Sequence, residues 1–274
     1  MAPSEDRPSP DEARSTRMSV GLGENRVPGP DAVAEGETAS MERRRRILEV
    51  TAAGLVFGLV GLGLLAMGAH NAREAARAAT CCGRIGEIGL AMLHYHEKYG
   101  HFPPAYVADA NGRPMHSWRV LLLEFLNPTL FQAYDFSEPW DGPKNRQLVR
   151  WMPSTYGCPS HPESQEQGFT NYVVVVGEGT VFPGTRGVSI DEVRDGRDST
   201  ILVVEAVGLN IPWTEPRDLR FDEMSFKLND RKRPSIGSYH RAGPHACMVD
   251  WTKVVLQGPP ERIRPLLTIA AKDE

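Results

Sequence analysis

The longest hydrophobic run in the chain, residues 47–67, directly follows four consecutive arginines at positions 43–46. A helix of this length, at ~1.5 Å rise per residue, crosses a hydrocarbon core of ~30 Å. The arginines lie on the N-terminal flank alone, so the positive-inside rule predicts a cytoplasmic N-terminus and an extracytoplasmic domain after the run. We therefore expect residues 43–69 to form a transmembrane anchor that crosses the cytoplasmic membrane once.

Beyond residue 70 the pattern changes from wholly apolar to amphipathic, with no proline between the two parts. Apolar residues recur every three or four positions, which is the spacing of one face of a helix. This stripe comprises Cys81, Ile85, Ile88, Met92, Tyr95 and Tyr99. Gly100 and the pair Pro103-Pro104 end it. A single helix of about 50 residues is expected, lipid-embedded in its first half and packed on a domain in its second.

The remaining pattern predicts short strands separated by long loops that contain proline and glycine. Four β-branched or apolar runs are bounded by Gly, Pro or Asp, at residues 171–176, 200–206, 246–250 and 253–256. A closing helix is expected at residues 261–271, after two prolines. The predicted fold class is α+β, with the long N-terminal helix packed on an antiparallel sheet in one exported domain, residues 70–274.

The first 40 residues are rich in Pro, Gly, Ser and acidic residues and contain no aromatic residue. Such a composition cannot bury enough apolar surface to offset the entropy of ordering. We expect residues 1–42 to be a disordered cytoplasmic tail; alternatively, Met41 is the initiator and the preceding residues are not translated. The net charge is −4, so no basic surface for nucleic acid is indicated beyond the arginine run.

Small residues and one carboxylate within the apolar run bear on its processing and assembly. Ala66 and Gly68 offer a small-x-small cleavage pattern, but the h-region of a signal peptide spans only ~7–15 residues, so a retained anchor is favoured. Gly54 and Gly58 have the spacing at which two membrane helices approach closely. Glu49 is ionisable and intramembrane, although a negative charge also suits the first turn of a helix. We take Glu49, Gly54 and Gly58 as candidates for helix assembly.

The four cysteines are expected to lie in an oxidising compartment. Cys81 belongs to the apolar stripe and Cys158 lies in a loop that can return to it, so a Cys81–Cys158 disulfide is the preferred pairing. The alternative is that all four cysteines are reduced and buried. A zinc site is not expected, because no Cys-x-x-Cys pair is present and the adjacent Cys81 and Cys82 cannot readily bind one metal from a helix.

No catalytic motif has the required spacing. His96-Glu97 and His101 are one residue too far apart for His-Glu-x-x-His, and neither Gly-x-Ser-x-Gly nor Gly-x-x-x-x-Gly-Lys occurs. The sequence therefore predicts no catalytic, cofactor-binding or metal-binding residue.

Two sets of polar residues remain possible ligand-binding or metal-binding sites. His240, His245 and Asp250 are the best candidates for a ligand or metal site, against ordinary hydrogen bonding in loops. The acidic loop at residues 135–141 carries hard oxygen donors for calcium, although its spacing does not match an EF-hand.

Ten blocks along the chain resemble, in order, those of the pilin-like family named domain of unknown function 1559 (DUF1559), which is abundant in planctomycete bacteria. The blocks are Ala72–Arg77 followed by Cys81, Ile88–His96, Tyr99–Tyr106, His116–Leu123, Glu138–Pro143, Cys158–Ser160, Thr170–Val173, Asp195-Gly196 with Thr200–Glu205, Trp213–Leu219 and Ser238–Asp250. Family members typically begin with a prepilin signal and are treated as type II secretion or type IV pilus-like proteins.

The chain departs from the family pattern at two places. Arg44 stands where prepilin processing requires a glycine, five residues before Glu49, so we expect no cleavage by a prepilin peptidase. The late Asp-Gly-Ser turn of the family reads Asp250-Trp251-Thr252 here, which removes the favoured turn signal of a hairpin.

The resemblance implies a non-enzymatic, membrane-anchored pilin-like or pseudopilin-like envelope protein with a role in assembly or secretion. Its expected partners are the lipid bilayer and either copies of itself or other pilin-like proteins, with no nucleic acid and no cofactor. The alternative is a membrane-tethered module that binds an extracytoplasmic ligand such as a polysaccharide. In that case Trp118, Trp140 and Trp213 are the residues expected to stack on sugars, although tryptophans in a domain of this size more often belong to the core.

Overall fold

The computed structural model describes residues 30–270, with side chains from residue 38 onward. Contacts divide the chain into two units, Met1–Leu65 and Ala66–Glu274. The first helix, α1 (Pro30–Tyr99), contributes residues to both units. It begins inside the segment 1–42 that we expected to be disordered, and this expectation is wrong for residues 30–42. Pro30 has the fixed φ that suits a first helical position, and the Ala- and Glu-containing sequence after it favours a helix. Residues 1–29 lie outside the described part.

The apolar stretch of α1 presents its side chains to the surroundings on every side. Within the described residues, one helix is long and apolar enough to cross a membrane, and its apolar stretch is not buried against the rest of the chain. Leu55 and Phe57, for example, are 69% and 77% exposed. A helix that is hydrophobic all round requires an apolar environment.

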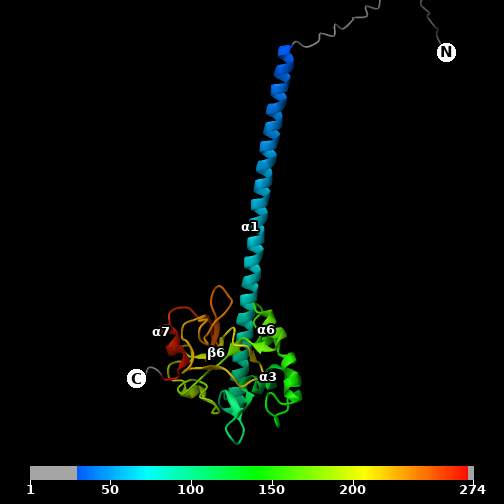
Figure 1. The fold of residues 1–274 in the computed structure, drawn as a ribbon. Helices are drawn as coiled ribbons and strands as arrows, with labels where there is room; N and C mark the ends of the chain where they lie inside the picture. The colour runs from blue at the N-terminus through cyan, green and yellow to red at the C-terminus, as the bar shows by residue number, and fades with distance from the viewer. Residues whose placement is uncertain (1–29, 271–274) are drawn as a thin grey trace, which may run out of the picture. The chain divides into compact units, whose positions relative to one another are not determined.

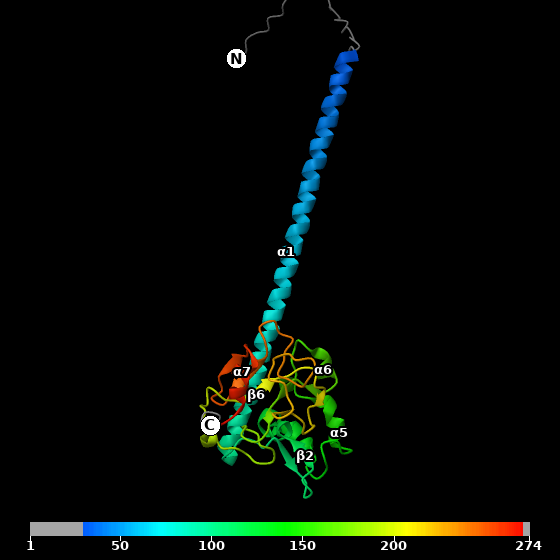
Figure 2. The ribbon, with the colours of Figure 1, turned by 60° about the vertical axis from the view of Figure 1, so that its left-hand side comes forward.

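The second half of α1 supplies one side of the hydrophobic core of the second unit, as its stripe predicts. Cys81, Ile85, Ile88 and Met92 are fully buried, whereas Tyr99, at the last position, is 45% exposed. Figures 1 and 2 show this part of the helix running beside strand β6. The helix ends where Gly100 adopts a φ of 80° and donates its N–H to the carbonyl of His96.

The main sheet has four antiparallel strands in the order β10-β9-β6-β4. These are β4 (Tyr172–Val173), β6 (Ile201–Glu205), β9 (His245–Met248) and β10 (Lys253–Val255). The four expected strands are present but shorter. The run 171–176 divides into β4 and β5 (Val175–Val176), because Val174 between them donates its N–H to the carboxylate of Asp218.

Three two-stranded sheets and a series of short helices complete the second unit. The sheets pair β1 (Tyr106–Ala108) with β2 (Pro114–Ser117), β3 (Phe169–Thr170) with β7 (Ile211–Pro212), and β5 with β8 (Leu219–Arg220). The last pair is parallel, which departs from the expected all-antiparallel arrangement. The helices are α2 (Trp118–Leu121), α3 (Leu123–Leu126), α4 (Pro128–Ala133), α5 (Asn145–Leu148), η1 (Val149–Trp151), η2 (Ser154–Tyr156), α6 (Pro162–Glu166) and η3 (Ile190–Glu192).

Both faces of the main sheet are buried, which explains why β6 is apolar at four successive positions. Val203 and Cys247 belong to the core cluster that includes α1, and Val204 and Ala246 belong to a second cluster on the opposite face. Helices α7 (Pro260–Ile263) and η4 (Arg264–Leu267) contribute to that second cluster. The closing helix is shorter than the expected 261–271, and Pro265, which has no N–H, lies at the change from α to 3₁₀ geometry.

The β9–β10 hairpin forms although the Asp-Gly turn signal is missing. Trp251 takes the left-handed conformation with a φ of 70°, where glycine is normally preferred. Its indole N–H donates to the carbonyl of Gly86 in α1 at 2.8 Å, and Lys253 Nζ lies 4.2 Å from the ring centroid. Contacts with α1 therefore hold a turn that local sequence disfavours.

Candidate functional site

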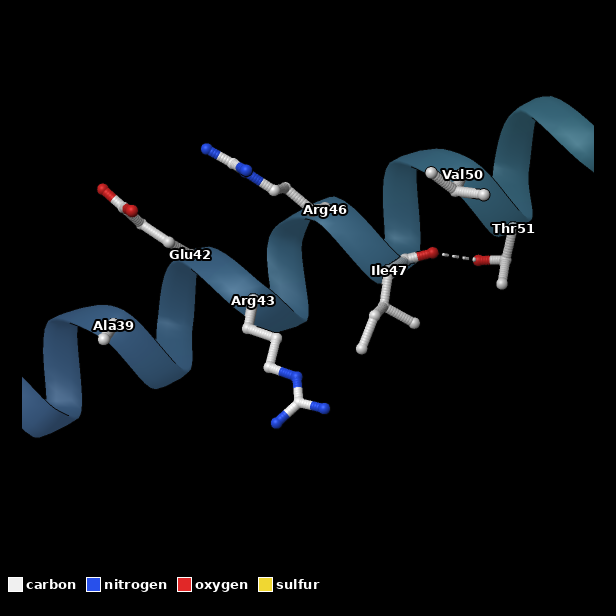
Figure 3. Close-up of a pocket in the computed structure, with 7 residues that line it drawn as sticks. All are labelled: Ala39, Glu42, Arg43, Arg46, Ile47, Val50 and Thr51. Atoms are coloured by element: carbon white, nitrogen blue, oxygen red, sulfur yellow. Dashed lines mark hydrogen bonds between the residues drawn. The ribbon is translucent and has the colours of Figure 1, made fainter.

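The three residues that we took as candidates for helix assembly, Glu49, Gly54 and Gly58, lie on an exposed surface of α1. Arg45 donates to Glu49 across one helical turn at 2.9 Å, and the Glu49 side chain is 62% exposed. An added Cβ at Gly54 or Gly58 would meet nothing within 4 Å. Figure 3 shows the start of this segment, where the Thr51 hydroxyl donates to the Ile47 carbonyl and the arginine side chains extend outward.

A second candidate site lies inside the second unit, where polar residues interrupt the core between α1 and the main sheet. The strand register places Tyr172 of β4 opposite Glu205 of β6, and Val204 opposite Ala246 of β9. Glu205 and His245 follow in the same register, at the ends of their strands. All three side chains are buried, and Glu205 is 0% exposed. A carboxylate with no exposure requires partners.

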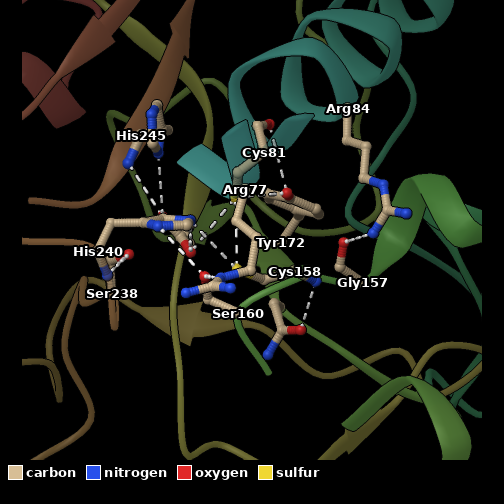
Figure 4. Close-up of polar contacts among 12 residues, drawn as sticks. Arg77, Cys81, Arg84, Gly157, Cys158, Ser160, Tyr172, Ser238, His240 and His245 are labelled. Atoms are coloured by element: carbon tan, nitrogen blue, oxygen red, sulfur yellow. Dashed lines mark hydrogen bonds and ion pairs between the residues drawn. The ribbon is translucent and has the colours of Figure 1, made fainter. Parts of the chain in front are cut away.

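Two cysteines meet beside this row of side chains. Cys81 Sγ lies 3.6 Å from Cys158 Sγ, 2.8 Å from the Tyr172 hydroxyl and 3.5 Å from Glu205 Oε1. Within the described residues all cysteines are free. The two sulfur atoms are close but not bonded, so the Cys81–Cys158 disulfide stays a prediction. Figure 4 shows Cys81, Cys158 and Tyr172 turned toward one another.

His240 connects the cysteines to two carboxylates. Its Nε2 lies 3.4 Å from Cys158 Sγ and 3.9 Å from Glu205 Oε1, while its Nδ1 lies 2.7 Å from Glu74 Oε1. Glu74 lies about two helical turns before Cys81 on α1. Its Oε2 forms an ion pair with Arg77 Nη2 at 2.7 Å. Each ring nitrogen of His240 thus faces a different group.

These contacts set the charge states of the cluster. Hydrogen bonds from Cys81 and then His240 outweigh burial and lower the pKa of Cys158 to about 6. The same thiol pair, together with burial, raises the pKa of Cys81. Burial disfavours the charged imidazole of His240, but hydrogen bonds with Cys158 and Glu74 outweigh it and raise its pKa to about 9. Both shifts favour negative charge on Cys158 and positive charge on His240, with Cys81 donating its S–H to Cys158.

The arrangement has three chemical capacities. The two thiols can be oxidised to a disulfide. Cys158, His240 and Glu74 have the connectivity of a nucleophile, a base and an orienting carboxylate, but Cys158 is 0% exposed and a nucleophile needs access to its substrate. Ligand atoms of Cys81, Glu205, His240 and His245 all lie within 4.8 Å of one another, which is the spacing of a metal site.

The structure separates the other residues that the sequence grouped. It brings His240 and His245 together, with ring centroids 5.3 Å apart, but Asp250 is exposed and instead accepts hydrogen bonds from Thr252 in the β9–β10 turn. In the acidic loop, Glu138 accepts from two backbone N–H groups at 2.7 Å. Asp135 is paired with Lys144. The loop therefore uses carboxylates to fix its own backbone.

The tryptophans expected to stack on sugars are mostly core residues. Trp118 and Trp213 are 0% exposed, and Trp140 is half-buried. The structure therefore excludes Trp118 and Trp213 from a sugar-binding surface and agrees with their interpretation as core residues. Both lie in the core against Tyr156, where Trp213 stacks on the tyrosine ring and Trp118 meets it edge-to-face.

Sequence reasoning missed Glu74 and Glu205 and did not connect Cys158 with His240. One signal was available: Glu205 ends a strand of four buried apolar residues, and a carboxylate in such a run is costly unless it serves a partner. The partners themselves come from segments up to 166 residues apart, and no local spacing reveals them.

Comparison with known proteins gives a family match for residues 70–189, the first part of the second unit. Residues 70–189 match the family described as "Protein of unknown function (DUF1559)". The matched range includes Glu74, Cys81, Cys158 and Tyr172, while Glu205 and both histidines lie beyond it. No curated protein and no solved structure gives a significant match.

Proposed function

Through residues 70–189 the chain belongs to the DUF1559 family, whose function is unknown, and from this premise we propose that it is a single-pass, membrane-anchored envelope protein of pilin-like or pseudopilin-like type. Its role is non-enzymatic and lies in assembly or in secretion-related interactions. The domain lies on the extracytoplasmic side of the cytoplasmic membrane. The observation that carries the proposal is α1, one helix whose apolar, exposed residues are followed by turns that fill the core of the domain.

The exposed apolar surface of α1 supports a lipid environment for this segment. Soluble monomers rarely expose contiguous apolar patches larger than a few hundred Å². Here nearly every side chain between residues 47 and 67 is exposed. A bilayer removes this surface from water, and the arginine run at residues 43–46 favours retention of the N-terminus in the cytoplasm.

Arg44 favours a protein that stays anchored in the membrane rather than a pilin subunit that leaves it. Without a glycine before the expected cleavage point, the arginine run stays attached to the helix. On insertion scales each arginine costs at least ~2.5 kcal/mol in the bilayer, so pulling four of them through lipid is opposed by roughly 10 kcal/mol. The protein then acts as an anchored platform for pilin-like partners.

Membrane fractionation combined with N-terminal mass spectrometry tests this proposal. The full chain should resist alkaline carbonate, dissolve in detergent and keep the arginine run at residues 43–46. Protease added to spheroplasts should degrade the domain. A soluble product that begins after Ala66 or Gly68 would contradict the anchor. Recovery in sheared extracellular filaments, with an N-terminus between residues 44 and 50, would contradict the platform and favour an ordinary pilin.

Assembly through the anchor has its own test. Cross-linking in native membranes should give a dimer or a complex with another pilin-like protein, and Gly58→Ile should reduce it because the larger side chain separates the helices. Gly63→Ile is the matched control, since at 3.6 residues per turn Gly63 lies on the side of the helix opposite Gly54. Equal loss in both variants, or no loss in either, would argue against the Gly54–Gly58 face.

A further inference from the structure

Four side chains of the buried cluster place their ligand atoms in a closed ring. In order around the ring, the distances are 3.6 Å from Cys81 Sγ to Cys158 Sγ, 3.4 Å to His240 Nε2, 3.9 Å to Glu205 Oε1 and 3.5 Å back to Cys81. Each of the four residues is buried, at 0–4% exposure. They come from α1, the loop after η2, the loop before β9, and β6.

The three distances that involve sulfur, 3.4–3.6 Å, agree with the edges of a zinc tetrahedron, and the 3.9 Å between His240 Nε2 and Glu205 Oε1 is slightly longer than such an edge. Zinc bonds of about 2.3 Å to sulfur and 2.0–2.2 Å to nitrogen and oxygen, at tetrahedral angles, require ligand atoms about 3.3–3.8 Å apart. We propose that Cys81, Cys158, Glu205 and His240 bind one zinc ion. Thiolate sulfur with imidazole and one carboxylate is a ligand set that favours zinc over magnesium or calcium.

The surrounding residues form the outer shell that such a site needs. A histidine that binds a metal usually donates its other ring N–H to a carboxylate, and Glu74 lies 2.7 Å from His240 Nδ1. This contact leaves Nε2 free to face the sulfur atoms. On the opposite side, His245 Nδ1 lies 3.4 Å from Glu205 Oε2. The other carboxylate oxygen, Oε1, is therefore the one that faces the proposed zinc ligands.

The closed geometry assigns a structural role to the ion. Four protein ligands fill the coordination of zinc and leave no open position for water or substrate. Zinc binding releases the proton of the Cys81 thiol and any proton on Cys158 or His240 Nε2, and the dication offsets the negative charge of two thiolates and one carboxylate. The ion joins α1 to the sheet and neutralises ligand charges that would otherwise be buried in the core.

A Cys81–Cys158 disulfide would use the same two sulfur atoms and exclude the metal. It leaves unexplained the position of His240 Nε2 against Cys158 and the burial of Glu205 beside Cys81. The numbers of free thiols and of zinc ions per chain distinguish the two states. The zinc site requires Cys81 and Cys158 without a disulfide and one metal ion per chain, whereas the disulfide form has neither.

The test uses the full chain purified in detergent without added chelator. We expect one zinc per chain by elemental analysis and no Cys81–Cys158 disulfide by mass spectrometry of the alkylated protein. After chelation under reducing conditions, cobalt(II) should bind and give the visible bands of tetrahedral cobalt together with a thiolate charge-transfer band. A protein that holds no zinc as purified and takes up no cobalt when reduced, or one that holds copper instead, would overturn the proposal.

Variants locate the site. Cys158→Ser should lose the bound zinc, whereas the matched control Cys82→Ser, at the neighbouring helical position of Cys81, should keep it. Glu74→Gln alters only the outer shell and should weaken zinc affinity by about 10–100-fold in competition with a chelator. Should Cys158→Ser fail to fold, Glu74→Gln still decides: unchanged affinity in that variant would contradict the proposed role of His240.

Discussion

Arg119 and Asp218 form an ion pair that is closed off from solvent, with Arg119 Nη2 2.5 Å from Asp218 Oδ1 and side chains that are 0% and 2% exposed. The guanidinium also donates to the carbonyl of Tyr172 at 3.0 Å, and the carboxylate accepts the N–H of Val174 at 3.0 Å. Burial raises the pKa of Asp218, and the neighbouring Arg119 opposes this effect. The pair joins helix α2 to the segment where the strand run 171–176 divides.

Removing one member of this pair should be strongly destabilising. Asp218→Asn keeps the shape but leaves the charge of Arg119 buried without compensation, which costs about 3–5 kcal/mol. Urea unfolding of the full chain in detergent, followed by tryptophan fluorescence, measures the loss. The control is Asp191→Asn in the exposed pair with Arg197, which should leave the midpoint unchanged. Equal effects of the two substitutions would contradict a special role for burial.

Two glycines six positions apart on α1 should respond to alanine with opposite signs. A Cβ at Gly89 would lie 2.4 Å from Cys247 Sγ, so Gly89→Ala should destabilise by about 1–3 kcal/mol through overpacking. Gly83 has nothing within 4 Å, and Gly83→Ala should stabilise by about 0.5–1 kcal/mol because alanine loses less backbone entropy.

A second substitution identifies the clash as the cause. Cys247→Ala removes the sulfur that Gly89→Ala would meet, so the double variant should be more stable than the sum of the two single effects predicts. Additive losses by chemical denaturation would show that Cys247 is not the obstacle.

The turn at Trp251 should prefer glycine to alanine once the indole is removed. Both Trp251→Gly and Trp251→Ala lose the hydrogen bond to Gly86, but only glycine adopts a φ of 70° without steric cost. The glycine variant should therefore be the more stable of the two by about 1–2 kcal/mol in thermal or urea unfolding. Equal stability would mean that the turn relaxes to another conformation when the contact with α1 is lost.

The end of α1 should lose stability at acid pH through Glu124. A hydrogen bond from Lys98, and then one from Tyr99, lower the pKa of Glu124 below its ordinary value of 4.5. A lowered folded-state pKa means that the stabilisation is present above pH 4.5 and is lost as the pH falls through the folded value. The melting temperatures of the wild type and Glu124→Gln should therefore differ at neutral pH and converge in acid.

Lys98→Met provides the control for this pH dependence. In that background Glu124→Gln should have a smaller effect at neutral pH, because the principal partner of the carboxylate is gone. A pH dependence that is unchanged in Lys98→Met would assign the acid sensitivity to another group.

Helix α1, with an exposed apolar stretch followed by a buried stripe, was predictable because helical periodicity is a property of neighbouring residues. The apolar run ending at Met67 and the stripe from Cys81 onward each repeat within a few positions, and the structure confirms both as parts of one helix. The strand runs were visible for the same reason. Their ends were not, since Val174 leaves the ladder only because Asp218, distant in sequence, accepts its N–H.

The buried cluster depended on tertiary structure alone. Glu74 and His240 are 166 positions apart, and Cys81 and Glu205 are 124 apart, so only the packing of α1 on the sheet brings them together. Sequence analysis set a zinc site aside because it searched for ligands at short spacing. The alternative of a sugar-binding module included Trp118, which the folded chain encloses. Local pattern determines which elements form, whereas the burial of charges and ligands depends on which distant segments the fold places side by side.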